Sequence, residues 1–160
     1  EAPSYELSKE PGYPTTFPPD TKPDTVQDSE SVLKTNKKEN AGTKGCTTVT
    51  DWGYLSEPVK SGNDVTSYAY TYAATTCWHE PITRVKVSQT LWKWNFSTSS
   101  WDKMVRDKDY NNYAGYAEAF PTYENAESGY YITTSTHYAQ QGVWPILDEN
   151  GESDYVWLEF

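Results

Sequence analysis

The segment LWKWNFSTSSW at positions 91–101 holds three tryptophans within eleven residues. An indole ring offers a large, rigid apolar face and one N–H donor, which suits it to stack on a sugar ring or to anchor a protein partner. Three such rings in contact would form an apolar patch of the kind that soluble monomers usually keep for a partner. We therefore predict a surface that binds a glycan or an extracellular protein at Trp92, Trp94 and Trp101.

The strand expected at residues 82–94 decides which way two of these rings point, because successive side chains of a strand alternate between its faces. Counting from Arg84, one face carries Val85, Val87 and Leu91. The same count places Trp92 and Trp94 on the opposite face, toward solvent. A β-bulge near Thr90 would instead turn both rings into the core, where most tryptophans lie. The sequence leaves both arrangements open.

A second aromatic run lies in the strand expected at residues 65–77, where tyrosines alternate with small residues. The tyrosines are Tyr68, Tyr70 and Tyr72. If Cys77 faces the core, the small residues line a tight interface and the tyrosines form an exposed ladder. If the tyrosines face inward, their hydroxyls need hydrogen-bond partners. We include these three tyrosines in the predicted ligand-binding surface.

Cys46 and Cys77 are the only cysteines of the chain. The abundance of Tyr, Trp, Thr and Ser with an acidic balance is typical of extracellular proteins, in which disulfides persist. We predict a Cys46–Cys77 disulfide, which closes a loop of about 31 residues and contributes about 3–4 kcal/mol in the chain-entropy model. The alternative is that the two thiols never meet. A disulfide would also leave Cys77, which stands two residues before His79, without a free thiol to act as a nucleophile.

Acidic side chains recur in the segment DENGESD at residues 148–154, and carboxylate and amide oxygens are ligands for calcium. The candidate ligands are Asp148, Asn150, Glu152 and Asp154. The glycine stands at the fourth position of the segment rather than at the sixth, so the pattern of an EF-hand loop fails. The favoured interpretation is an acidic turn without a metal, and we expect no cofactor.

Charge and motif content narrow the classes of function. The formal charge of −10 opposes binding to nucleic acids and to anionic membranes. No apolar run approaches the roughly 20 residues that span a bilayer. Neither a Gly-x-Ser-x-Gly elbow nor a P-loop occurs, so we predict a protein that is not an enzyme. Carboxylates are numerous, however, and a hydrolase that uses a pair of them stays an alternative.

Short runs rich in Thr, Tyr, Val and Trp alternate with turn-forming clusters from residue 45 onward, which is typical of strands. We expect strands near 45–52, 65–77, 82–94, 101–107, 112–119, 129–139 and 153–160. About seven short strands at this spacing predict an all-β, antiparallel β-sandwich, with a small closed barrel as the alternative.

The stretch ESGYYIT at residues 127–133 resembles the acid-Ser-Gly/Ala-x-Tyr-x-Cys stretch of immunoglobulin-type domains. The resemblance implies an immunoglobulin-like sandwich in which Tyr131 makes a corner before a late strand. Thr133 stands where the family has its second cysteine, so the family's inter-sheet disulfide is missing there. The composition and order of segments also resemble small secreted proteins of Gram-positive bacteria.

Residues 1–44 differ from the rest, since six of the ten prolines fall there and no tryptophan does. Proline removes backbone donors and favours extended conformations, so we predict an extended or disordered arm before a sandwich domain at 45–160. Together these features predict a secreted, non-catalytic binding module. The alternative is a structural or self-assembling extracellular protein whose arm docks on a neighbouring subunit.

Overall fold

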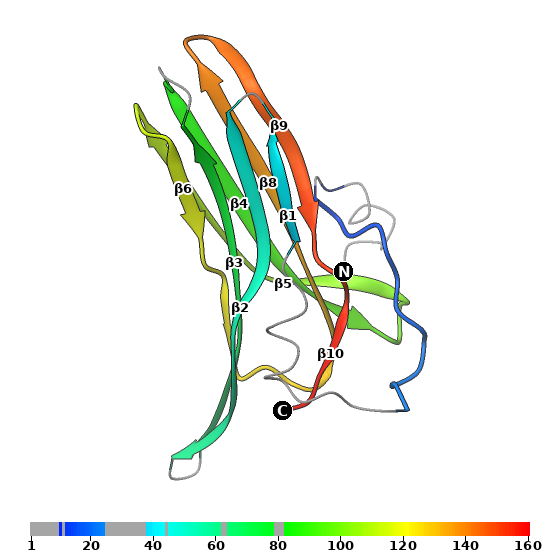
Figure 1. The fold of residues 1–160 in the computed structure, drawn as a ribbon. Coiled ribbons are helices and arrows are strands. Elements are labelled where there is room, and N and C mark those ends of the chain that lie inside the picture. Colours follow the sequence, from blue (N-terminus) through cyan, green and yellow to red (C-terminus); the bar gives the residue numbers. More distant parts are fainter. Residues whose placement is uncertain (1–9, 11, 25–37, 44, 62–63, 79–81) are drawn as a thin grey trace.

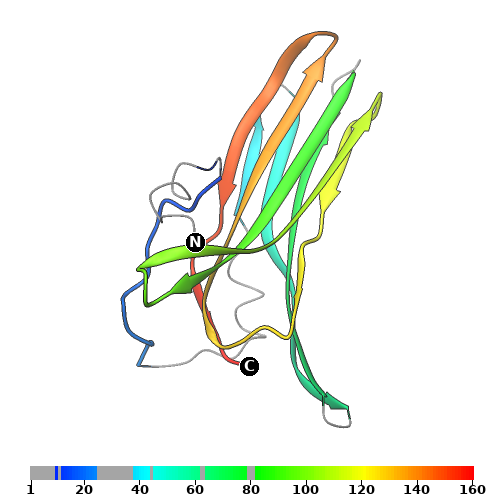
Figure 2. The same ribbon diagram turned by 180° about the vertical axis from the view of Figure 1, so that it is seen from behind.

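Two antiparallel sheets packed face to face make up the computed structural model of the chain (Figures 1 and 2). The structure describes residues 10, 12–24, 38–43, 45–61, 64–78 and 82–160. The prediction of an all-β, antiparallel β-sandwich is confirmed. Over this described part of the chain, no helix is long and apolar enough to cross a membrane.

Sheet A has the strand order β1-β2-β3-β6, and β7 also pairs with β3. Its strands are β1 (Lys38–Thr43), β2 (Cys46–Ser61), β3 (Asp64–Cys77), β6 (Tyr116–Ala119) and β7 (Thr122–Glu124). The hairpin of β2 and β3 extends beyond the other strands at one end of the sandwich (Figure 1).

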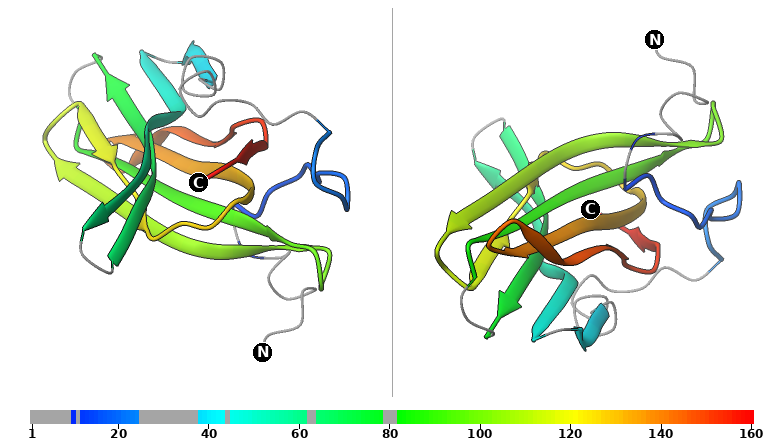
Figure 3. Two further views of the ribbon diagram at one scale, coloured as in Figure 1. Left: turned by 90° about the horizontal axis from the view of Figure 1, so that it is seen from below. Right: turned by 90° about the horizontal axis from the view of Figure 1, so that it is seen from above.

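Sheet B has the order β10-β8-β4-β5, and β9 pairs with the part of β8 that β10 leaves free. Its strands are β4 (Arg84–Asn95), β5 (Ser100–Asn112), β8 (Gly129–Gln141), β9 (Trp144–Glu152) and β10 (Val156–Leu158). The two sheets form separate layers when the molecule is viewed end-on (Figure 3). We call the face of sheet B that is turned away from sheet A its outer face.

Strand alternation assigns the residues of sheet B to its two faces. In β8, Ser135 and His137 hydrogen-bond to Thr50 and Thr75 of sheet A, so the odd-numbered residues of this strand face inward. The buried apolar side chains between the sheets include Ala69, Ala73, Val85, Val87, Leu91, Tyr131, Ala139 and Leu158. Among the described side chains, those of β3 in this interface are small, and those of sheet B contribute most of the bulk.

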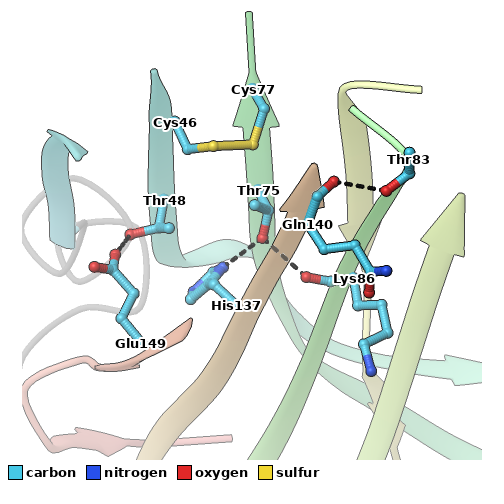
Figure 4. The surroundings of a disulfide bond; sticks show 9 residues. All are labelled: Cys46, Thr48, Thr75, Cys77, Thr83, Lys86, His137, Gln140 and Glu149. Atoms are coloured by element: carbon cyan, nitrogen blue, oxygen red, sulfur yellow. Dashed lines mark hydrogen bonds between the residues drawn. A yellow bond between two sulfur atoms is a disulfide. The ribbon is translucent and has the colours of Figure 1, made fainter. Parts of the chain in front are cut away.

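The disulfide predicted from composition is present. Cys46 and Cys77 are directly opposed on β2 and β3, and their side chains are buried (Figure 4). Cys77 faces inward with Ala69, Thr71 and Ala73, so small residues line the interface on this strand, as in the first of the two predicted arrangements.

Tyr131 is buried near the start of β8 and is held by a hydrogen bond to the backbone. Its hydroxyl donates to the carbonyl oxygen of Glu127, four residues upstream, at 2.6 Å. Burial raises the pKa of this hydroxyl. Thr133 is also buried in the interior, where its Oγ1 accepts a hydrogen bond from Gln89 Nε2 at 2.7 Å and donates to the carbonyl of Thr90.

Two predicted boundaries were wrong. The arm was expected to run to residue 44, yet Lys38–Thr43 form β1 and pair with β2. The segment 148–153 was expected as an acidic turn, yet residues 144–152 form β9. Pairing with β8 overrides the local turn preference there, and Gly151 lies opposite Ser135 where a side chain would collide with Thr50.

Candidate functional site

The three tryptophans of the segment 91–101 are buried, which contradicts the predicted exposed surface. Trp92 is 1% exposed, Trp94 4% and Trp101 0%. The strand count itself was right, since Trp92 donates from Nε1 to Thr134 on the outer face of sheet B. The one bulge of this hairpin lies at Leu91–Trp92 relative to β5, and it does not turn the rings inward.

A segment distant in the sequence covers these rings. We call residues 12–24 the strap, because they run along the outer face of sheet B, away from sheet A (Figures 1 and 3). The ring of Tyr13 packs edge-on against Trp92, with centroids 5.3 Å apart. The ring of Phe17 packs against Trp94 at 5.8 Å. Aromatic pairs in this geometry are each worth about 0.5–1.5 kcal/mol beyond the area they bury.

Hydrogen bonds fix the strap on the tryptophan cluster. The backbone N–H of Trp101 donates to the Tyr13 hydroxyl at 3.0 Å, and its indole Nε1 donates to the carbonyl of Thr16 at 2.8 Å. The Glu152 carboxylate accepts bonds from the backbone N–H and the hydroxyl of Thr15, at 2.6 and 2.9 Å. The strap therefore completes a third apolar cluster on the far side of sheet B.

Beyond the strap, the outer face of sheet B is open and forms a groove of about 390 Å³. We call it the sheet-face groove and define it by Lys86, Arg106, Lys108, Tyr110, Thr136 and Tyr138. These residues come from the three adjacent strands β5, β4 and β8, and the cross-strand register places Tyr110 and Tyr138 on either side of Lys86. The strap borders the groove, since Gly12 lies against Thr134 and Thr136.

The groove combines cations, aromatic rings and hydroxyls. The Lys86 ammonium lies over the ring of Tyr138, 4.6 Å from its centroid. The guanidinium of Arg84 lies over the ring of Tyr110 at 5.2 Å, and Tyr110 is 56% exposed. On the floor, the hydroxyls of Ser88 and Thr136 bond to each other at 2.5 Å. All these groups belong to strands paired on both sides or to a long hairpin, so their positions are preorganised.

A Ser–His pair lies between the sheets. His137 Nε2 is 2.7 Å from Ser135 Oγ. On the other side of the ring, Nδ1 is 2.8 Å from Thr75 Oγ1, and Figure 4 shows this second contact. The spacing of the Ser135–His137 pair is that of a nucleophile and its base, but Ser135 is 2% exposed and His137 1%. An external substrate has no access to this pair, so we assign it to the polar interior of the sandwich.

The hydrogen bonds of His137 fit a neutral imidazole. Thr75 Oγ1 donates to the carbonyl of Lys86 and so accepts from Nδ1–H of the imidazole. Nε2 is then the acceptor for the Ser135 hydroxyl. Burial lowers the pKa of His137 from its usual 6.5 to about 4, against a smaller opposing effect of the Glu149 carboxylate.

The calcium candidates do not converge. Asp148, Asn150 and Glu152 are spaced by two residues along β9, so neighbours are about 6.6 Å apart along the strand. The Glu152 carboxylate is already bonded to the strap. Asp154 lies beyond the end of the strand. Among the described residues, no three His, Cys, Asp or Glu side chains gather to hold a metal ion.

The predicted tyrosine ladder is described only in part. Tyr72 is half-buried and its hydroxyl is 3.0 Å from that of Tyr116. The side chains of Tyr68 and Tyr70 lie outside what the structure describes, although both residues pair with β7. Burial, and next the hydrogen bond to Glu118, raise the pKa of the Tyr116 hydroxyl.

Sequence reasoning missed the sheet-face groove. The signal was present in β5, where Arg106, Lys108 and Tyr110 alternate on one face and continue the row that Lys86 begins on β4. The prediction placed the binding surface at the tryptophans, which lie on the half of the outer face that the strap covers, whereas the groove lies on the other half. Other exposed rings, Trp78 and Trp144, lie singly near the ends of strands, which is ordinary on a protein surface.

No protein-family model matches the chain, and the search of curated proteins found no match. Function must therefore be argued from the residues of the groove.

Proposed function

We propose that this chain is an extracellular, non-catalytic binding module, and that its ligand is a glycan held in the sheet-face groove. The observation that carries the proposal is the alternation of tyrosine rings, cations and hydroxyls on one open sheet face that the strap leaves uncovered. The Cys46–Cys77 disulfide fits an extracellular setting, because disulfides persist in oxidising compartments.

The chemistry of the groove suits a sugar. The positive C–H edges of a pyranose ring are attracted to the negative face of an aromatic ring, and Tyr110 is the most accessible ring of the groove. Ser88 and Thr136 offer hydroxyls that can both donate and accept hydrogen bonds to sugar hydroxyls. The floor of the groove is a sheet, and the volume of about 390 Å³ is within the range of ligand sites.

The test is binding of the purified protein to a panel of neutral and acidic polysaccharides by affinity electrophoresis, followed by calorimetry on each polysaccharide that retards it. We expect Tyr110→Ala and Tyr138→Ala to weaken binding at least ten-fold. Tyr113→Ala is the matched control, because Tyr113 is 84% exposed and lies outside the groove. No retardation by any polysaccharide, or equal loss in the control, would refute the proposal.

A second candidate is self-association through the arm. Every copy of the chain carries the same strap-binding face, so a strap released from its own domain could bind a neighbour. In the structure the strap lies on its own sheet. Sedimentation of the whole chain and of a chain lacking residues 1–24 tests this: a concentration-dependent oligomer that the deletion abolishes supports exchange, and a monomer at all concentrations opposes it.

A further inference from the structure

We infer that the ligand of the sheet-face groove is an anionic glycan, one whose sugar units carry a carboxylate or a sulfate. This inference rests on the proposed function and adds the chemical class of the ligand. Its basis is the local excess of positive charge in a chain whose formal charge is −10.

Three cations gather in the groove, and none of them forms an ion pair with an acidic residue of the described part of the chain. Lys86, Arg106 and Lys108 are all exposed. Ion pairs of the described residues join Lys22 to Glu159, Lys93 to Glu127 and Lys103 to Glu10, and no groove cation takes part in one. In an acidic chain, cations left unpaired side by side are available to a ligand anion.

The cross-strand register brings these cations within reach of one ligand. Arg106 and Lys108 are two residues apart on the same face of β5, about 6.8 Å along the strand. Lys86 lies on the neighbouring strand, directly opposite Tyr110. Nη2 of Arg106 points over the floor toward Ser88 Oγ, at 3.4 Å. A sugar acid placed on the floor would meet a cation on the β5 side and hydroxyls beneath it.

Two acidic residues line the groove, one on each side. Asp148 faces it from β9, opposite Tyr138. Asp109 also lines it, but its carboxylate accepts bonds from the backbone N–H of Glu118 and from Asn111, so it is engaged with the neighbouring strand. Charges farther away are screened beyond about 8 Å at physiological ionic strength, so the groove cations dominate the field that a bound sugar meets.

The chemistry favours a sugar acid over an acidic peptide. The groove offers hydroxyls and tyrosine rings between its cations, which match the alternation of hydroxyls, C–H faces and acid groups in an acidic polysaccharide. Its central strand β4 is paired on both sides, so a peptide lying on the floor finds no free backbone edge there, and of the described groove strands only β5, at the rim, ends the sheet.

Paired probes that differ only in charge test the inference. Polygalacturonate is compared with its methyl ester, and dextran sulfate with dextran, by calorimetry on the whole chain. We expect at least one acidic probe to bind ten-fold or more tightly than its neutral counterpart, and this preference to fall as salt rises. We expect Arg106→Gln and Lys108→Gln each to reduce the preference about ten-fold, since a hydrogen bond to a charged group is worth that much or more.

Two further variants sharpen the test. Lys93→Gln is the charge-matched control, because it removes a cation from β4 that lies outside the groove and pairs with Glu127. Asp148→Asn should strengthen binding of the acidic probe, because it removes a negative charge that borders the groove. If Asp148 only supported the structure of β9, this substitution would not strengthen binding.

The outcomes separate the two proposals. If a neutral probe binds as well as its acidic counterpart and Tyr110→Ala abolishes both, the module binds glycans and the anionic inference is wrong. If no polysaccharide binds, the proposed function itself fails. If poly-glutamate or a single-stranded oligonucleotide binds as tightly as the acidic polysaccharide, with the same dependence on Arg106, the glycan assignment is overturned.

Discussion

Acidification should destabilise this protein through one buried histidine. His137 is 1% exposed, and this burial lowers its pKa to about 4 against a smaller opposing effect of the Glu149 carboxylate. In the unfolded chain the imidazole titrates near 6.5. Between these two values the unfolded state binds a proton that the folded state does not. Stability from this group is therefore fully present above pH 6.5 and is lost as the pH falls toward 4.

The size of the effect follows from the two pKa values. A shift of 2.5 units corresponds to about 3.4 kcal/mol when the titration is complete. Integration over the window gives a loss of about 2 kcal/mol at pH 5 and about 3 kcal/mol at pH 4, relative to pH 7.5. For a domain of ordinary stability this is a large fraction of the free energy of unfolding.

Urea unfolding at pH 7.5, 6, 5 and 4 measures this loss for the unaltered chain and for His137→Asn. The variant leaves Thr75 and Ser135 poorly satisfied and will be less stable at neutral pH, so the readout is the pH dependence and not the absolute stability. We expect the variant to lose about 2 kcal/mol less than the unaltered chain between pH 7.5 and 5. His79→Asn, which alters the only other histidine, should leave the difference unchanged.

A second measurement does not depend on the variant folding. The imidazole resonance of His137 in the folded chain should titrate near pH 4. A titration near 6.5, or identical pH profiles for the chain and for His137→Asn, would refute the reasoning that burial dominates this site.

Two other predictions concern the strap and the disulfide. Tyr13→Ala removes the ring packed on Trp92 and the acceptor for the Trp101 N–H, so it should lower the free energy of unfolding by about 3 kcal/mol or release the strap from the sheet. Quenching of tryptophan fluorescence by acrylamide should then rise, when it is measured in a Trp78→Phe, Trp144→Phe background that removes two exposed indoles. Unchanged quenching would show that the strap does not protect the buried tryptophans. Replacing Cys46 and Cys77 together by Ala opens a loop that spans a sequence separation of 31 residues and should lower the free energy of unfolding by about 3.7 kcal/mol, whereas a loss below about 1 kcal/mol in urea unfolding would contradict the loop-entropy argument.

Strand alternation was the most reliable part of the sequence reasoning. It placed Val85, Val87 and Leu91 inside and Trp92 and Trp94 on the other face, and the structure has both sets there. These assignments depend only on local geometry, since the side-chain period of a strand is fixed at two. The pairing of the two cysteines was confirmed as well.

Burial of the tryptophans could not be predicted from the same count. Alternation states which face a side chain takes, but it does not state what covers that face. The cover comes from Tyr13, Thr16 and Phe17, which are about 80 residues earlier in the chain and carry no pattern that identifies their target. The proline-rich composition correctly excluded regular structure there, and an extended segment without backbone partners can lie against any face.

In the segment DENGESD, local sequence preferences predicted the wrong conformation. Asp, Asn and Gly favour turns locally, and the sequence alone predicts one. Pairing of β9 with β8 over Thr134–Ala139 supplies the backbone bonds that a turn would forgo, so long-range pairing decides the conformation.

The sequence by itself determined the strand class, the face of most side chains and the disulfide, because these follow from residue type and a fixed geometric period. The tertiary structure alone decided which outer face is open and which is covered. That depends on where the strap docks and on the register between β4, β5 and β8, which brings Lys86, Lys108 and Tyr138 into one groove from strands far apart in the chain. Contacts between distant segments depend on how well two whole surfaces fit each other in shape and chemistry, and a local sequence pattern does not contain that information.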